Sequence, residues 1–215
     1  MDVMRKNYAI GLFASACAAV LLTHMSATAA GAETYTAKLN GLNAGVVGSQ
    51  ATGEATFTID GDQLTIVVNA DGLPPNMMHL QHFHGFKDGS DARCPDSAAD
   101  KNGDGLIDLI ETEAYAGTTM VPFHNEPATM EIPSDSYPKA NADGSYRYEK
   151  VVSLKDLQAA FAEKFGTSDL NLDRRVVFIH GIPADSKLPE SAASLGAIPP
   201  QVTLPIACGE IEKGK

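Results

Sequence analysis

Hydrophobic and polar residues alternate along three segments near the start of the chain. The segments are 35–39, 51–59 and 63–70. Because successive side chains of a β-strand lie on opposite faces, this alternation predicts strands with one buried face. Asp60-Gly61-Asp62 separates the second segment from the third, and a turn of this composition predicts that the two strands form a hairpin.

The second half of the chain adds fewer elements. Residues 87–145 show little strand pattern, whereas 146–154 alternates again, and 175–180 and 202–211 have the composition of short strands. Apolar residues at helical spacing over 155–165 predict one short helix. Short strands separated by many turns are typical of antiparallel sandwiches and Greek-key barrels. We therefore expect an all-β fold, a Greek-key β-barrel or sandwich.

The N-terminus has the composition of a secretory signal peptide. Arg5 and Lys6 precede an apolar run over 9–22, and small residues follow over 26–32. We predict that residues 1–29 are removed and that the protein is periplasmic or secreted. An uncleaved anchor is the alternative, which the shortness of the apolar run disfavours. No later stretch is expected to cross a membrane.

The charge balance narrows the range of partners. A formal net charge of −11 and a pI of about 4.8 make electrostatic attraction to nucleic acid or anionic lipid unfavourable. With 44% hydrophobic residues among 215, the chain can build a packed core and is not a coiled coil or a disordered chain. We expect one domain over 30–215. The sequence leaves the oligomeric state open.

Two cysteines, Cys94 and Cys208, remain once the signal peptide is removed. In an exported protein a pair of cysteines favours a disulfide over two buried free thiols, which are the alternative. Such a bridge would close a long loop and contribute about 3–5 kcal/mol in the chain-entropy model.

Histidines are concentrated in one short segment. His79, His82 and His84 lie within six residues, and His180 ends a separate apolar strand. Residues i and i+2 of a strand share a face, so His82 and His84 can bind one ion, with His180 as a third ligand. Imidazole suits copper, zinc, iron and nickel. The alternative is a set of hydrogen-bonded histidines without a metal.

A second metal motif is rich in oxygen donors. Residues 100–111 match the calcium-loop pattern D-x-[DN]-x-[DN]-G-x5-E, within an EF-hand-like insertion at about 96–116. Calcium prefers oxygen ligands in this arrangement, and an acidic solvated loop is the alternative. The expected ligands are Asp100, Asn102, Asp104, the Leu106 carbonyl, Asp108 and Glu111.

The order of these motifs resembles the copper/zinc superoxide dismutase family over residues 34–211. The resemblance is carried by His79-x-x-His82-Phe83-His84, then Cys94, then the segment 175–180, then Ala207-Cys208-Gly209. It implies an eight-stranded Greek-key barrel of the superoxide dismutase type. It also implies a redox-active copper that consumes superoxide.

The resemblance also implies roles for single residues. It makes His82, His84 and His180 copper ligands, with His124 as the fourth. It makes His79 a structural histidine beneath the site. It further implies that a Cys94–Cys208 disulfide ties the loop beside the site to the last strand.

Two departures bear on the activity. No histidine lies between His124 and His180, so the family's zinc site is not expected. Pro205 occupies the position at which the family has an arginine that attracts superoxide. We therefore expect an exported copper protein that dismutates superoxide, while leaving open whether it is an enzyme. The alternatives are a non-catalytic copper protein that exchanges copper with a donor or acceptor, and a calcium-stabilised structural module.

Overall fold

β-Strands dominate the part of the chain that the computed structural model describes, residues 31–48 and 50–215. The expected signal peptide, residues 1–29, lies outside the described residues. The described strands form one antiparallel sheet, and the expectation of an all-β fold is confirmed. In chain order the strands are β1 Glu33–Gly41, β2 Thr52–Asp60, β3 Gln63–Asp71, β4 Leu80–Gly85, β5 Thr118–Pro122, β6 Tyr146–Ser153, β7 Val176–His180 and β8 Pro205–Lys213.

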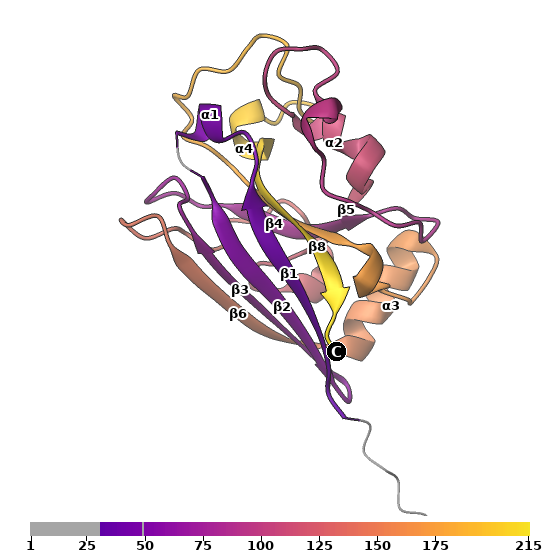
Figure 1. Ribbon diagram of the computed structural model, residues 1–215. Helices are drawn as coiled ribbons and strands as arrows, with labels where there is room; N and C mark the ends of the chain where they lie inside the picture. Colours follow the sequence, from indigo (N-terminus) through magenta and orange to yellow (C-terminus); the bar gives the residue numbers. More distant parts are fainter. Residues whose placement is uncertain (1–30, 49) are drawn as a thin grey trace, which may run out of the picture.

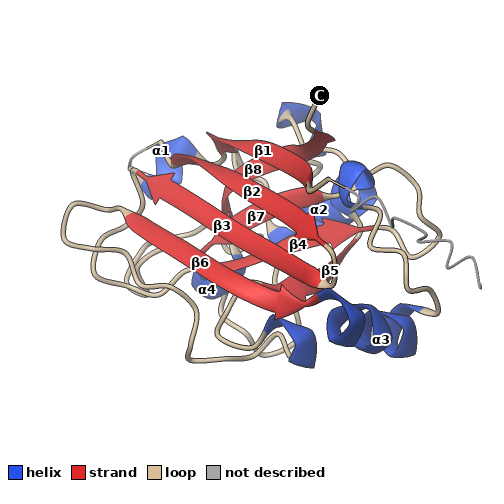
Figure 2. Cartoon of the chain, turned by 90° about the horizontal axis from the view of Figure 1, so that it is seen from below, coloured by secondary structure: helices blue, strands red, loops and turns tan. Residues whose placement is uncertain are grey.

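The sheet curls on itself and encloses the core. Its strand order is β5-β4-β7-β8-β1-β2-β3-β6, and β6, β3 and β2 lie across β7, β4 and β5 (Figure 2). The predicted hairpin is β2–β3, in which Asp60 pairs with Gln63. Phe57, Phe83 and Phe123 are fully buried between the two layers. This strand order does not establish the Greek-key barrel of the superoxide dismutase type that the resemblance implied.

The predicted helix is α3, Leu154–Phe165. The Ser153 side chain accepts a hydrogen bond from the first helical turn, and Gly166 ends the helix in the left-handed conformation that glycine tolerates. Leu157 and Phe161 are fully buried in the main core cluster. The helix therefore closes one end of the curled sheet (Figure 1).

The remaining helices are short and lie in the loops between the strands. Among the described residues, no helix is long and apolar enough to cross a bilayer. The α-helices are α1 Ala44–Val47, α2 Leu109–Ala116 and α4 Pro200–Thr203, and the 3-10 segments are η1 Ser97–Ala99, η2 Pro127–Thr129 and η3 Leu172–Arg174.

Strand β5 lies in the region where the sequence shows no strand pattern. Its last three residues, Met120, Val121 and Pro122, are all buried, so polar and apolar positions do not alternate. It pairs with β4 at the sheet edge, and a register shift at Phe83/His84 brings Thr119 opposite His84. The strand thereby contributes a side chain to the histidine face of β4.

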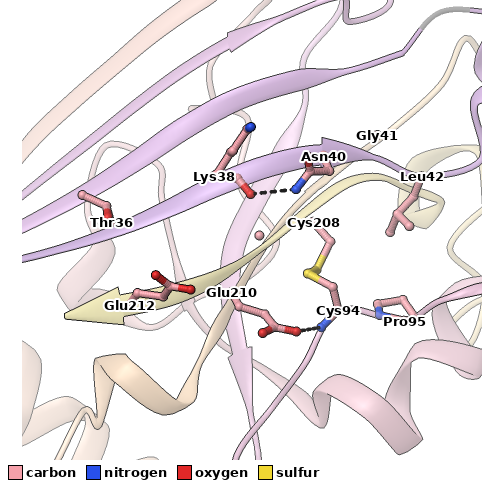
Figure 3. Close-up of a pocket in the computed structure, with 11 residues that line it drawn as sticks. Thr36, Lys38, Asn40, Gly41, Leu42, Cys94, Pro95, Cys208, Glu210 and Glu212 are labelled. Carbon is pink, nitrogen blue, oxygen red and sulfur yellow. Dashed lines mark hydrogen bonds between the residues drawn. A yellow bond between two sulfur atoms is a disulfide. The ribbon is translucent and has the colours of Figure 1, made fainter. Parts of the chain in front are cut away.

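A disulfide links the long loop after β4 to the last strand. Cys94 and Cys208 are bonded, with their Cα atoms 5.8 Å apart, so the free-thiol alternative does not describe this structure. The Cys94 backbone N–H also donates to Oε1 of Glu210 over 3.0 Å. Figure 3 shows both links beside an open hollow that is lined by the loop and by residues of β1 and β8. The loop is therefore held to β8 by a covalent bond and a charge-assisted hydrogen bond.

Candidate metal centre

Three histidines from two neighbouring strands converge on the loop-covered face of the sheet. His82 and His84 lie on β4, and His180 is the last residue of β7. Phe83, between the first two, points to the opposite face and packs in the core. Since β4 pairs with β7 in the register Leu80 to His180, the strand end brings the third ring to the same face.

The three rings are close enough to share one ion. Their centroids are 4.9 Å apart for His82 and His84, 4.7 Å for His82 and His180, and 5.8 Å for His84 and His180. One nitrogen of each ring lies within 4.8 Å of the other two, and no other such group occurs within the residues the structure describes. All three side chains are at most 3% exposed.

A hydrogen bond to the backbone determines which nitrogen of the His180 ring carries the proton. Nδ1 of His180 lies 2.7 Å from the Thr203 carbonyl oxygen, so this nitrogen carries the proton and donates it. Nε2 of His180 then presents a lone pair, and it is buried without a hydrogen-bond partner among the described residues. Metal-binding histidines characteristically donate their second N–H to a carbonyl in this way.

The other two rings touch each other. Nε2 of His84 lies 3.0 Å from Nδ1 of His82, so one of these nitrogens donates to the other. Nδ1 of His84 is buried and, within the described part of the chain, has no partner. A buried polar atom left unpaired costs about 1–3 kcal/mol. Two such atoms in one cluster indicate a missing binding partner.

Burial keeps these rings neutral. Desolvation lowers the pKa of His84 to about 3 and that of His180 to about 4, and in His84 the neighbouring His180 adds to the effect. Desolvation, then the proximity of His180 and His84, lowers the pKa of His82 well below its ordinary value. A neutral imidazole is the form that binds a metal, so the rings are in that form at neutral pH.

The metal-free protein is expected to lose stability on acidification. The ordinary histidine pKa is 6.5, and the folded values of His84 and His180 lie near 3 and 4. Between pH 6.5 and the folded pKa values, the unfolded chain binds protons that the folded chain does not. The free energy of unfolding therefore falls as the pH drops below about 6.5. The expected slope is on the order of 1 kcal/mol per pH unit for each titrating histidine. Urea unfolding of the chelator-treated protein between pH 7 and 4.5 measures this slope. A His180→Gln variant should show a shallower slope, and an equal slope contradicts the prediction.

His124, expected as a fourth ligand, lies outside this group. Its Nε2 is 2.7 Å from the Glu131 carbonyl oxygen, and its Nδ1 accepts a hydrogen bond from the Glu126 N–H over 3.0 Å. Its ring also meets Tyr137 edge-on, at a centroid distance of 5.1 Å. The residue therefore orders the loop after β5, with both ring nitrogens engaged.

His79 is fully buried next to the site. Its Nδ1 lies 3.1 Å from the His180 carbonyl oxygen, and its Nε2 lies 2.9 Å from the Pro74 carbonyl oxygen. Desolvation lowers its pKa. The ring thus links the backbone at the end of β7 to the loop before β4, which matches a structural position beside the three ligands.

The two arginines before β7 bind backbone carbonyl groups rather than the three histidines. Arg175 donates to the Leu170 and Phe86 carbonyl oxygens, and Arg174 donates to the Gly89 carbonyl oxygen. Pro205, the position at which an arginine was expected by resemblance, pairs with His180 across the β7–β8 ladder.

The acidic loop folds around its own backbone. Asp100 accepts hydrogen bonds from the N–H groups of Gly103 and Gly105, over 2.7 and 3.0 Å. Asp108 and Glu111 form a capping box at the start of α2. Within the described residues the loop carboxylates are not drawn together as closely as the ring nitrogens of the three histidines. Asn102, Asp104 and Leu106 belong to the same turn, in which Asn102 and Asp104 side chains accept backbone N–H groups.

The assignment of this segment as an EF-hand is wrong. An EF-hand places the loop between two helices. Here α2 follows the loop, but the three-residue 3-10 segment η1 precedes it, directly after Pro95 and the disulfide-bonded Cys94. Within the described residues, a three-residue 3-10 segment therefore stands where an EF-hand has its entering helix. Calcium binding at residues 100–111 stays a prediction.

Two partners of the histidines were missed from the sequence. Oγ1 of Thr119 lies 3.1 Å from Nε2 of His84, and the Thr203 carbonyl orients His180. Recognising β5 would have suggested Thr119, because β4 and β5 are adjacent. A backbone carbonyl leaves no signal in a sequence, so the role of Thr203 could not be found.

Comparison with known proteins assigns the chain to a different family from the one that its motifs resembled. The family model described as CHRD domain matches residues 35–160. No protein with a curated function matches the chain. The matched region includes His82, His84 and the acidic loop, whereas His180 and Cys208 lie beyond it.

This match overturns the resemblance to the copper/zinc superoxide dismutase family. It likewise overturns the expected dismutase function and its description as an oxidoreductase, and it adds no support for an EF-hand. The resemblance rested on a few short motifs in the same order, and a spacing of two residues places side chains on one face of any β-strand, whatever its family. The match to more than half of the chain is the more specific finding.

Proposed function

Since the chain belongs to the CHRD domain family, we propose a function that rests on its own buried histidines: the protein binds one transition-metal ion through His82, His84 and His180. Copper is the expected ion. Imidazole is a suitable ligand for copper, and among the divalent first-row transition metals Cu²⁺ generally binds a given site most strongly. Binding here implies neither turnover of superoxide nor any other reaction.

A single observation carries this proposal. His180 donates from Nδ1 to the Thr203 carbonyl, and its buried Nε2, which has no hydrogen-bond partner among the described residues, lies close to two further imidazoles. If these histidines were an ordinary part of the core, each buried nitrogen without a hydrogen-bond partner would reduce the stability of the fold by about 1–3 kcal/mol. An ion bound between the rings would supply the missing partner.

Elemental analysis after equilibrium dialysis tests the proposal. We expect one copper per chain, a weaker uptake of Zn²⁺, and loss of the bound copper in a His82→Ala, His84→Ala double variant. His124→Ala is the matched control, because this histidine lies outside the group, and it should retain one copper. Circular dichroism checks that each variant is folded, and His180→Ala replaces the double variant if that one unfolds. Equal copper content in all variants would refute the site.

We propose in addition that the acidic loop takes Ca²⁺ as a structural ion. Its residues also hold the 183–199 loop, because Asp104 accepts from the Ser191 hydroxyl and Asp108 accepts from the Ala193 N–H. An ion at this loop would therefore rigidify two loops at once.

Calorimetric titration with CaCl₂ tests this second site. A lone extracellular site is expected to bind with a Kd of about 10⁻⁴–10⁻³ M. Asp100→Asn should abolish the heat, whereas Asp143→Asn, at another exposed turn in which the carboxylate accepts the Ser145 N–H, should preserve it. A titration without heat, together with a melting temperature unchanged by calcium or EGTA, contradicts the proposal.

A further inference from the structure

One of the three histidines is reached from the surface by a cleft. The cleft has a volume of about 300 Å³, and His84 contributes to its lining, whereas His82 and His180 do not. It lies between α2, β5 and the end of α3, which are on the same side of the molecule (Figure 1). Its walls are mostly apolar, with Leu109, Ile132, Leu195 and Ile198 among them.

The apolar walls near the mouth are not covered by the rest of the chain. Leu195 is 48% exposed and Ile198 is 43% exposed, although both are large aliphatic residues. Both belong to the 183–199 loop, which the acidic loop holds in place through Asp104 and Asp108. Concave, mostly apolar hollows with a few convergent polar groups are the usual form of small-molecule sites.

The polar groups lie at the inner end. Oγ1 of Thr119 and Nε2 of His84 are 3.1 Å apart, and both residues line the cleft. Three imidazoles do not fill the coordination sphere of a copper or zinc ion, so at least one position stays open to another ligand. Because His84 and Thr119 line the cleft, a ligand bound there would reach the metal from the His84 side.

The side chains that line the cleft carry one charge of each sign. Glu113 contributes a carboxylate, and Lys164 contributes an ammonium group that donates from Nζ to the Met130 carbonyl over 2.8 Å. The other walls are mostly apolar, and burying a charged group against apolar walls costs free energy. A ligand with an uncharged body therefore fits this lining.

We propose that the cleft binds a small neutral organic molecule with an apolar body and one Lewis-basic nitrogen or oxygen, which takes the open position on the metal beside His84. This inference rests on the proposed function, because it requires an ion held by the three histidines. The apolar body would pack against Leu195 and Ile198, and the basic atom would face Thr119 and the metal.

Two probes of different size test the inference on the copper-loaded full chain. Imidazole and 4-phenylimidazole carry the same basic nitrogen, and the phenyl group adds apolar area that the cleft can bury. Visible absorption of the bound Cu²⁺ follows each titration. We expect both probes to shift the spectrum, and 4-phenylimidazole to bind at least about tenfold more tightly.

Variants of the wall separate cleft binding from simple coordination. Leu195→Ser with Ile198→Ser should remove most of the preference for the phenyl compound and leave imidazole affinity unchanged. Val151→Ser is the matched control, because Val151 is an equally exposed aliphatic residue at 54% on β6, outside the cleft lining. It should keep the full preference.

The outcomes distinguish the two proposals. If the chain takes up no copper, the proposed function fails and this inference fails with it. If copper binds but the probes leave its spectrum unchanged, strip it from the protein, or bind with equal affinity in all variants, the cleft inference alone is overturned.

Discussion

Saturation with Cu²⁺ is expected to raise the free energy of unfolding by about 2.7 kcal/mol when free copper is a hundredfold above its Kd. The physical reason is that the three ligands come together only in the folded chain. His82 and His84 share one face of β4, but His180 reaches them through the β4–β7 pairing. Urea unfolding with and without copper measures the difference.

The His180→Ala variant should lose most of this stabilisation. Two imidazoles on one strand remain, and their binding is no longer tied to the pairing of β4 with β7. His124→Ala should be stabilised as much as the unaltered protein, because both nitrogens of its ring are engaged in its own loop. Equal stabilisation of the His180 variant would show that copper binds elsewhere.

Removal of the disulfide is the second large effect expected. Replacing Cys94 and Cys208 by serine opens a loop with a sequence separation of 114 residues. The chain-entropy model assigns about 3–5 kcal/mol to such a closure. The Cys94 N–H bond to Glu210 is too weak to replace it, since a hydrogen bond to a charged group contributes about 1.5–3 kcal/mol. Guanidinium unfolding of the double variant measures the loss.

The unaltered protein in reducing agent is the control for the serine variant. Both lack the covalent link, so both should unfold at the same lower denaturant concentration. A double variant as stable as the oxidised protein would show that the loop is held by its packing alone.

Much of the fold follows from hydrophobic patterning. The segments predicted at 51–59 and 63–70 are β2 and β3 to within one residue, and the turn between them has the expected hairpin register. The alternation at 146–154 became β6, and the helical spacing over 155–165 became α3. These elements each bury a single face, so their period is visible in the sequence.

Other elements of the fold show no such periodicity in the sequence. In β5 three successive residues are buried, because both faces of this short strand are covered. A strand of that kind cannot be separated from a loop by alternation. The pairing of β4 with β7, which sets the geometry of the histidines, is a long-range contact that no local pattern reveals.

The candidate site was also only partly predictable from the sequence. The sequence predicted that His82, His84 and His180 form one group, and the structure brings the three rings together. The resemblance to a dismutase extended this set to His124, whose loop turns its ring toward Glu131 and Tyr137. Likewise, a matching string of acidic residues predicted an EF-hand-like insertion, but a three-residue 3-10 segment stands where an EF-hand has its entering helix. Short motifs indicate local chemistry, whereas the partner elements depend on the whole fold.

An anomalous difference map from a copper-soaked crystal, measured at the copper absorption edge, would locate the bound ion. We expect one peak between the rings of His82, His84 and His180, within bonding distance of Nε2 of His180. A peak at His124 instead, or three rings unchanged around an empty centre at saturating copper, would contradict this expectation.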